Sequence, residues 1–153
     1  MPDAIKHFMT HPVHVIGAQQ PLSEAHRQMN DLGVRHLPVR SGGKLVGLVS
    51  QRDLHLIETL RDVNPEEVPV EEAMSQDVLT VELDAPLQQV VHEMAERKLG
   101  SALVVDGGEL VGIFTTVDAL RALEQLCLRP VAPAAPPRRS ARKPPSPSGT
   151  GLG

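Results

Sequence analysis

Aromatic residues are nearly absent from this sequence: its 153 residues include two phenylalanines and neither tyrosine nor tryptophan. Nucleic-acid modules that stack bases on aromatic rings need several such side chains, and so do aromatic-lined sugar sites and cages for quaternary ammonium groups. The composition therefore argues against these kinds of site. Hydrophobic residues still make up 41% of the chain, close to the value for a globular domain, so we expect a core of aliphatic side chains.

Cysteine and long apolar runs are equally scarce. Cys127 is the single cysteine, which excludes an internal disulfide and fits a reducing compartment. No apolar run approaches the roughly 18 residues that a membrane helix needs, and no signal-peptide pattern is visible. We therefore expect a cytoplasmic protein without a membrane partner.

Charge is divided unevenly along the chain. Residues 1–128 carry all 19 acidic and ten basic residues, a net charge of −9, whereas residues 129–153 carry five basic residues and no acidic one. A body of this charge is a poor general binder of polyanions such as nucleic acid. The segment 129–153 also holds seven of the 14 prolines and is predicted to be a disordered basic tail.

The acidic body is an internal repeat. Shifting the chain by 65 residues aligns 9–53 with 74–118 without a gap, and 12 of the 45 positions are identical. Because the matches include the helix-start prolines, the paired glycines and the apolar positions, they indicate a duplicated fold.

Each repeat has the pattern of a β-α-β-β-α unit. Opening strands are predicted at 13–16 and 78–83, and helices follow Pro21 and Pro86, where proline is tolerated at a helix start. Glycine pairs at 42–43 and 107–108 join two apolar runs as in a hairpin, and a second helix closes each unit. We assign the repeats to 1–61 and 71–128, with a polar linker at 62–70. The predicted class is α+β, with the two small repeats packed through their sheets.

The junction between the last strand and the closing helix has the same motif in both repeats. It reads GLVSQRD at 47–53 and GIFTTVD at 112–118, a glycine followed by a hydroxyl residue and then an aspartate. Backbone N–H groups at a helix start, with a short hydroxyl, could hold phosphate or ribose oxygens. The same spacing is also a capping box, which needs no ligand, and the residues alone leave both interpretations open.

The order of elements, the Leu37-Pro38-Val39 run and the duplicated junction motif resemble the cystathionine-beta-synthase (CBS) domain family over about residues 1–128. Two tandem copies form the CBS pair, or Bateman module. The resemblance implies two related clefts between the repeats that bind adenosine-containing ligands, namely AMP, ADP, ATP or, as a further candidate, S-adenosylmethionine. It also implies a homodimer that regulates a partner protein not identifiable from the sequence.

Site residues follow from the resemblance by position. Ser50 with Asp53, and Thr115 with Asp118, would bind phosphate and ribose, and Thr80 would lie near the base. The segments that would line the clefts are Arg35, His36 and Leu37 in the first repeat and Gly100, Ser101 and Ala102 in the second. Val15 stands opposite Thr80 and Leu103 opposite Pro38, so the two clefts are expected to be unequal.

Few cations lie near these clefts in the sequence, and an unpaired buried phosphate is costly, so a mono- or diphosphate ligand is preferred to a triphosphate. The candidate cations are Arg35, Arg52, Arg97, Lys98 and Arg121. No phosphate loop, zinc-protease motif or nucleophile elbow is present. We therefore expect no catalytic residue, no required cofactor and no metal site.

Two alternatives remain open. In the first, the body only dimerises and the basic tail binds a protein or nucleic acid. In the second, the acidic body senses a divalent cation. The preferred interpretation is a non-catalytic sensor of an adenosine nucleotide.

Overall fold

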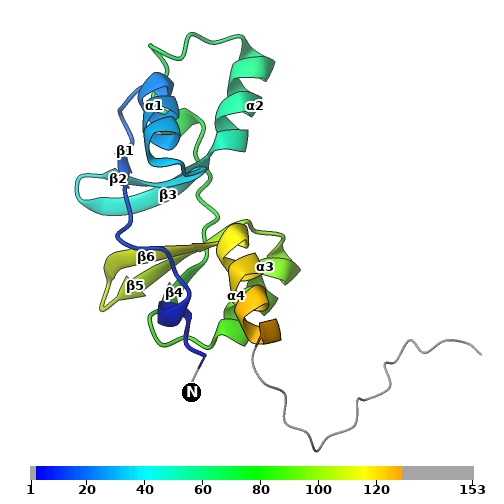
Figure 1. The fold of residues 1–153 in the computed structure, drawn as a ribbon. Coiled ribbons are helices and arrows are strands. Elements are labelled where there is room, and N and C mark those ends of the chain that lie inside the picture. The colour runs from blue at the N-terminus through cyan, green and yellow to red at the C-terminus, as the bar shows by residue number, and fades with distance from the viewer. Residues whose placement is uncertain (1–2, 129–153) are drawn as a thin grey trace, which may run out of the picture. The chain divides into compact units, whose positions relative to one another are not determined.

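The computed structural model describes residues 3–128, and the predicted tail at 129–153 lies outside them. The β-α-β-β-α order occurs twice, as predicted (Figure 1). The first half contains β1 (Ile16–Gly17), α1 (Leu22–Leu32), β2 (His36–Ser41), β3 (Lys44–Ser50) and α2 (Gln51–Arg61). The second contains β4 (Thr80–Glu82), α3 (Leu87–Arg97), β5 (Ser101–Asp106), β6 (Glu109–Thr115) and α4 (Thr116–Leu128). Short 3-10 helices, η1 (Ile5–His7) and η2 (Val70–Glu72), precede the two halves.

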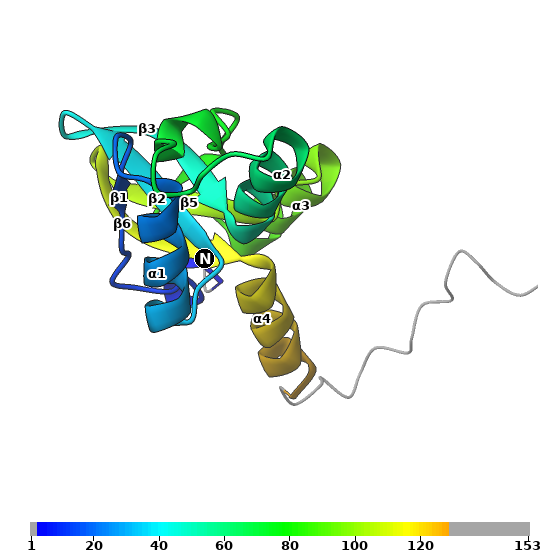
Figure 2. The same cartoon turned by 90° about the horizontal axis from the view of Figure 1, so that it is seen from above.

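Each half forms one mixed three-stranded sheet, ordered β1-β2-β3 and β4-β5-β6. The first pair in each sheet is parallel and the second is an antiparallel hairpin. Gly42 and Gly43 at the first hairpin turn have φ of 60° and 80°, which a two-residue turn of this kind requires and glycine permits. This turn lies at the end of the hairpin away from α2 (Figures 1 and 2).

The chain exchanges short segments between the two halves. We call residues 5–10 and 70–75 the leading segments, because each precedes the first strand of a repeat. Ile5 N donates to Ala85 O (2.8 Å) in the second half, and Val70 N donates to Gln20 O (2.8 Å) in the first. These two bonds are equivalent under the 65-residue shift, so the repeat extends beyond its identical residues.

Each leading segment then pairs with the last strand of the opposite sheet. Thr10 exchanges two backbone hydrogen bonds with Ile113 (2.8 and 3.0 Å), and Ser75 exchanges two with Leu48 (2.8 and 2.9 Å). The leading segments pass directly over Gly47 and Gly112 of these strands. A Cβ at Gly47 would lie 2.8 Å from Ser75 O, and one at Gly112 would lie 3.1 Å from Thr10 O. The glycine of the junction motif therefore permits a close backbone approach.

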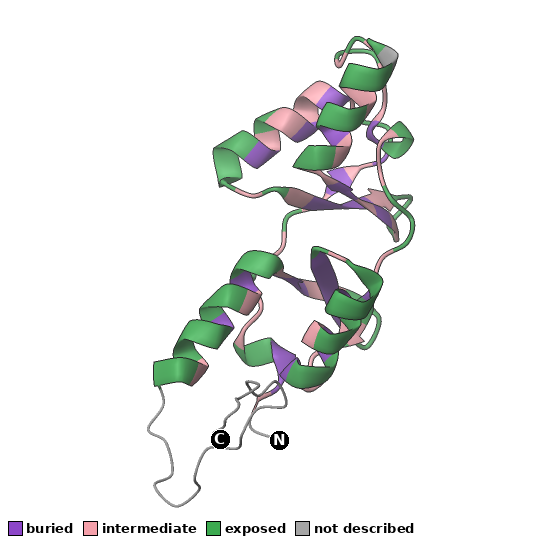
Figure 3. Cartoon of the chain, turned by 90° about the vertical axis from the view of Figure 1, so that its right-hand side faces the viewer, coloured by how far each residue is buried: buried purple, intermediate pink, exposed green. Residues whose placement is uncertain are grey.

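The core is aliphatic, as the composition predicts, and buried residues gather in the strands and on the inner helix faces (Figure 3). Leu54 on α2 is fully buried, and Val70 from η2 completes the same cluster around α1 and the first sheet. Phe114 on β6 is the one fully buried aromatic residue among those described.

The outer faces of α2 and α4 carry exposed apolar side chains. Leu60 is 74% exposed and Leu120 is 61% exposed, although both continue the apolar pattern of their helices. The other exposed apolar residues of these two helices are Leu56, Val117, Leu123 and Leu128. Cys127 on α4 is exposed as well.

Candidate functional site

The first junction forms a complete capping box at the start of α2. Asp53 N donates to Ser50 Oγ (3.0 Å), and Ser50 N donates to Asp53 Oδ2 (2.9 Å). Two donors at the helix start are thus satisfied reciprocally, as the capping interpretation of the motif requires. The second oxygen of Asp53, Oδ1, receives no hydrogen bond within the described part of the chain.

The second junction binds its aspartate more tightly. Thr115 N donates to Asp118 Oδ2 (2.9 Å), and Asp118 N donates to Thr115 Oγ1 (3.4 Å). The Thr115 hydroxyl also lies 3.3 Å from Asp118 Oδ2, and the Thr10 hydroxyl donates to both carboxylate oxygens. Asp118 is only 9% exposed. These hydrogen bonds hold the carboxylate in one orientation at the start of α4.

A cavity of about 700 Å³ lies beside the second junction, with residues of both repeats in its wall. Five predicted site residues line it: Arg35, His36, Gly100, Thr115 and Asp118. The remaining lining residues are Thr10, Leu32, Gly33, Val34, Ile113, Thr116, Val117 and Arg121. Its size is within the range of pockets that hold a small ligand.

Equivalent backbone contacts position the predicted cleft segments. Gln51 N donates to Arg35 O (2.9 Å) at the start of α2, and Thr116 N donates to Gly100 O (3.1 Å) at the start of α4. A Cβ at Gly100 would lie 3.6 Å from His36 Nε2. The segments at 35–36 and at 100 therefore approach each other, as the predicted position between repeats requires.

The other predicted site residues lie away from this cavity wall. Leu37 lines a neighbouring cavity of about 240 Å³, together with residues 10–14, and His36 borders both cavities. Ser101 and Ala102 are buried on β5, where they pair with Thr115 and Phe114 of β6. Thr80 is exposed on β4, where it pairs with Leu103. Ser50 lies opposite His36 in the first hairpin.

The cations of the large cavity are not neutralised by neighbouring acids. Neither Arg35 nor Arg121 forms an ion pair with any residue that the structure describes. Arg97, by contrast, pairs with Asp77 (2.6 Å) and Glu93 (3.4 Å). The only carboxylate in the cavity wall is Asp118. The exposed charge of the wall is therefore positive, although the chain is acidic.

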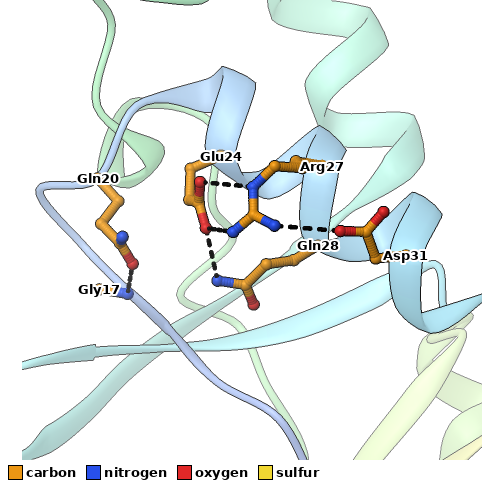
Figure 4. A network of polar contacts seen from close by, with 6 residues as sticks. All are labelled: Gly17, Gln20, Glu24, Arg27, Gln28 and Asp31. Carbon is orange, nitrogen blue, oxygen red and sulfur yellow. Dashed lines mark hydrogen bonds and ion pairs between the residues drawn. The ribbon is translucent and has the colours of Figure 1, made fainter.

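A second open groove, of about 600 Å³, adjoins Arg35 along α1. Arg27 also lines it, but its guanidinium is engaged within the helix (Figure 4). Arg27 Nε donates to Glu24 Oε1 (3.0 Å), Nη2 pairs with the same carboxylate, and Nη1 donates to Asp31 (3.1 Å). These hydrogen bonds lower the pKa of Glu24, so the pair stays ionised. Arg35 is thus the cation of this region that a ligand could use.

Burial lowers the pKa of His36, and the charge of Arg35 lowers it further, while the nearby charge of Asp53 opposes both effects. His36 is therefore neutral at pH 7. Asp53 of the first junction thus acts through its charge on His36, a residue of the cavity wall.

The lowered pKa of His36 predicts a loss of stability in acid. As the pH falls through the ordinary value of 6.5, the unfolded chain takes up this proton before the folded chain does, so the free energy of unfolding decreases. Thermal unfolding at pH 7.5 and 5.5 should show a smaller decrease for His36→Gln than for the original protein. His92→Gln, at an exposed helix position, is the control, and an equal decrease in all three proteins would contradict the assignment.

Sequence reasoning missed Thr10 as a site residue. Its hydroxyl bonds Asp118 across 108 positions of sequence, a separation that no local motif reveals. The available signal was the repeat itself, because Thr10 aligns with Ser75, another hydroxyl residue, immediately after the identical Met9 and Met74.

Between residues 3 and 128, no group of three or more His, Cys, Asp or Glu side chains is arranged to hold a metal ion. In the same part of the chain, no helix has the length and apolar character needed to cross a membrane.

The fold and the duplicated junctions define a tandem CBS domain pair. The CBS domain family pattern matches residues 5–56 and 70–125, so the chain belongs to this family. It is 32% identical over 116 residues to the uncharacterized protein YlbB of Bacillus subtilis, covering 74% of this chain and 78% of YlbB.

Solved structures show the same architecture. An acetoin utilization protein (AcuB) from Vibrio cholerae matches with a TM-score of 0.73 and 32% identity, over 83% of this chain and 94% of AcuB. The CBS domain pair of protein MJ0100, solved with 5'-methylthioadenosine and S-adenosyl-L-methionine, matches with a TM-score of 0.73 and 25% identity, over 80% and 97% of the two chains.

Some relatives are much longer. The chain is 32% identical over 112 residues to inosine-5'-monophosphate dehydrogenase of Korarchaeum cryptofilum, which is 72% of this chain but 22% of the enzyme. The similarity is thus to a minor part of that enzyme.

Proposed function

We propose that the protein is a non-catalytic, cytoplasmic regulatory module that binds an adenosine nucleotide in the cavity beside Thr115 and Asp118. The supporting observation is the composition of that cavity. It combines residues from both repeats, a nearly buried carboxylate, the start of α4 and two arginines that form no ion pair with any residue between 3 and 128. A ribose diol would donate to Asp118, while phosphate would accept from the guanidinium groups of Arg35 and Arg121.

The base would rest on aliphatic side chains rather than on an aromatic ring. Leu32, Val34 and Ile113 line the same cavity, and apolar walls with a few polar groups are typical of small-molecule sites. The equivalent cleft at Ser50 and Asp53, with Thr80 and the backbone at 100–102, is proposed as the second and unequal site.

Charge favours a phosphorylated ligand over a cationic or neutral one. Protein MJ0100 was solved with S-adenosyl-L-methionine and 5'-methylthioadenosine, which lack phosphate. Here Arg35 and Arg121 would attract one or two phosphate groups, since an anion in a positive cleft is stabilised. AMP and ADP are therefore proposed ahead of metal-free ATP and of S-adenosylmethionine.

The regulatory role would act through association. The exposed apolar side chains of α2, Leu56 and Leu60, and those of α4, Val117, Leu120 and Leu123, are suited to contact a second copy of the chain. A ligand would then report to a partner protein by favouring one arrangement over another, which requires different affinities for the two arrangements.

Calorimetric titration of the full chain tests the proposal. AMP and ADP should bind more tightly than S-adenosylmethionine or ATP without Mg²⁺. Asp118→Asn should weaken AMP binding at this site by about tenfold to a hundredfold, because hydrogen bonds to a charged group are worth about 1.5–3 kcal/mol. The control is Asp106→Asn, since Asp106 is an exposed carboxylate at the end of β5, and it should leave binding unchanged.

The aromatic shortage supplies a second measurement. With neither tyrosine nor tryptophan, the protein absorbs weakly at 280 nm, so co-purified nucleotide should appear as a distinct band at 260 nm that acid precipitation releases. Absence of binding by AMP, ADP and S-adenosylmethionine would contradict the proposal. Loss of partner binding on removal of residues 129–153, with Asp118→Asn still active, would favour the adaptor alternative instead.

A further inference from the structure

The two junction aspartates are aligned in the repeat but differ in their hydrogen bonds. Asp118 accepts from the Thr10 hydroxyl at Oδ1 (2.9 Å) and Oδ2 (3.1 Å), and from Thr115 N and Oγ1 at Oδ2. Asp53 accepts from Ser50 N alone within the described residues. The Thr10 contact comes from the leading segment, and the contact of the Thr115 hydroxyl is a second, smaller difference that lies in the junction itself.

Thr10 and Ser75 occupy equivalent positions but use their hydroxyls differently. Both are held by paired backbone hydrogen bonds to the last strand of the opposite sheet. The Thr10 hydroxyl turns to Asp118, whereas Ser75 Oγ accepts from Asp77 N (3.2 Å) and makes no bond with Asp53 in the part of the chain described. Ser75 is therefore a natural internal control for Thr10.

The number of hydrogen bonds that the Asp118 carboxylate can accept limits how a ligand could bind to it. A carboxylate offers about four acceptor positions on its two oxygens. At Asp118, three donor groups already use most of them, two from Thr115 and one from Thr10. A cis-diol that donates both of its hydroxyls needs two of these acceptor positions. The contacts of Asp118 with Thr115 cannot be given up without disrupting the start of α4. The Thr10 hydroxyl is the donor that must yield, and Thr10 lies in the wall of the same cavity.

We propose that Thr10 is a specificity-determining residue, an inference that rests on the proposed function. Its hydroxyl competes with the ribose diol of the ligand for the Asp118 carboxylate. Its hydroxyl stands in for one ribose hydroxyl when no ligand is bound. A ribonucleotide gains its second bond to Asp118 only by displacing this hydroxyl, so Thr10 lowers the affinity of this site for cis-diols. A nucleotide without the diol does not compete and is unaffected.

Thr10→Val tests the competition, because valine has nearly the shape of threonine and no hydroxyl. Titration with AMP and with 2',3'-dideoxy-AMP separates the two effects. We expect Thr10→Val to bind AMP about two- to tenfold more tightly, the range of one ordinary hydrogen bond, with dideoxy-AMP binding unchanged. Thr10→Ser, which keeps the hydroxyl, and Ser75→Ala, the equivalent position, should both match the original protein.

A double-mutant cycle with Asp118→Asn excludes a merely structural effect. If Thr10 acts through the carboxylate charge, Thr10→Val should change AMP affinity far less in the Asp118→Asn background. Unchanged melting temperatures for Thr10→Val and Thr10→Ser would confirm that each variant is folded.

The outcomes distinguish the two proposals. AMP binding by the original protein that Thr10→Val leaves unchanged, or weakens, overturns the competition and leaves the proposed function intact. An equal gain for AMP and dideoxy-AMP also overturns it, because the diol would then be irrelevant. No AMP binding by any variant overturns the proposed function and the competition together.

Discussion

Replacing Phe114 by alanine is expected to lower the free energy of unfolding by about 3–5 kcal/mol. The side chain is 0% exposed on β6 and is the one fully buried aromatic group in the described residues. Its removal leaves a void that the surrounding close-packed core fills poorly. A domain of this size has a total stability of about 5–15 kcal/mol, so the loss is a large fraction of it.

Urea denaturation followed by circular dichroism measures this effect, since the chain has no tryptophan to report by fluorescence. Phe8→Ala is the matched control, because Phe8 is only partly buried and its loss should cost less. Equal destabilisation by the two substitutions would show that Phe114 does not anchor the second sheet. Since Ile113 and Thr115 flank Phe114 and line the cavity, Phe114→Ala should also weaken AMP binding.

The second large effect is expected at Gly47, where alanine should destabilise the protein by about 1–3 kcal/mol. The added Cβ would lie 2.8 Å from Ser75 O and 2.7 Å from Met74 Sδ. A methionine side chain can move, but the carbonyl is held by the backbone pairing of Ser75 with Leu48. The leading segment would therefore have to separate from β3.

Gly17→Ala provides the matched control on the first strand of the same sheet. A Cβ there would meet only the Gln20 side chain, at 3.6 Å, which is ordinary contact. We expect this variant to unfold at nearly the original urea concentration, and Gly47→Ala well below it. Similar midpoints for both variants would mean that the crossing is more adaptable than the distances indicate.

Strands and helices that follow local patterns could be predicted from the sequence. The returning strands occupy Lys44–Ser50 and Glu109–Thr115, as expected from the glycine turns that precede them. The opening strands are shorter than predicted, and the first pairs only at Ile16 and Gly17. Residues 11–15 follow Thr10, which is held on the opposite sheet, so they span the distance between sheets instead of pairing.

Site residues that belong to a repeated local motif could be predicted from the sequence. Contacts that depend on a leading segment reaching the opposite sheet could not. Both junction motifs, Arg35, His36 and Gly100 were found from the repeat and the family resemblance. The Thr10 contact with Asp118 and the exposure of Leu60 and Leu120 were not, because apolar spacing identifies a helix face without saying what covers it. The role of Gly47 and Gly112 likewise required knowledge of which segment passes over them.

The exchange of leading segments makes each half structurally dependent on the other. Val70 completes the core around α1, and Ile5 is fully buried and bonded to Ala85 in the second half. A polypeptide carrying a single repeat would lack the arm that closes its own sheet, and it could recover that arm only from a second molecule. The duplicated chain can thus be regarded as an arm-exchanged dimer whose two protomers were joined end to end. Such a topology makes unfolding cooperative between repeats, since neither arm can detach without exposing the core of its neighbour.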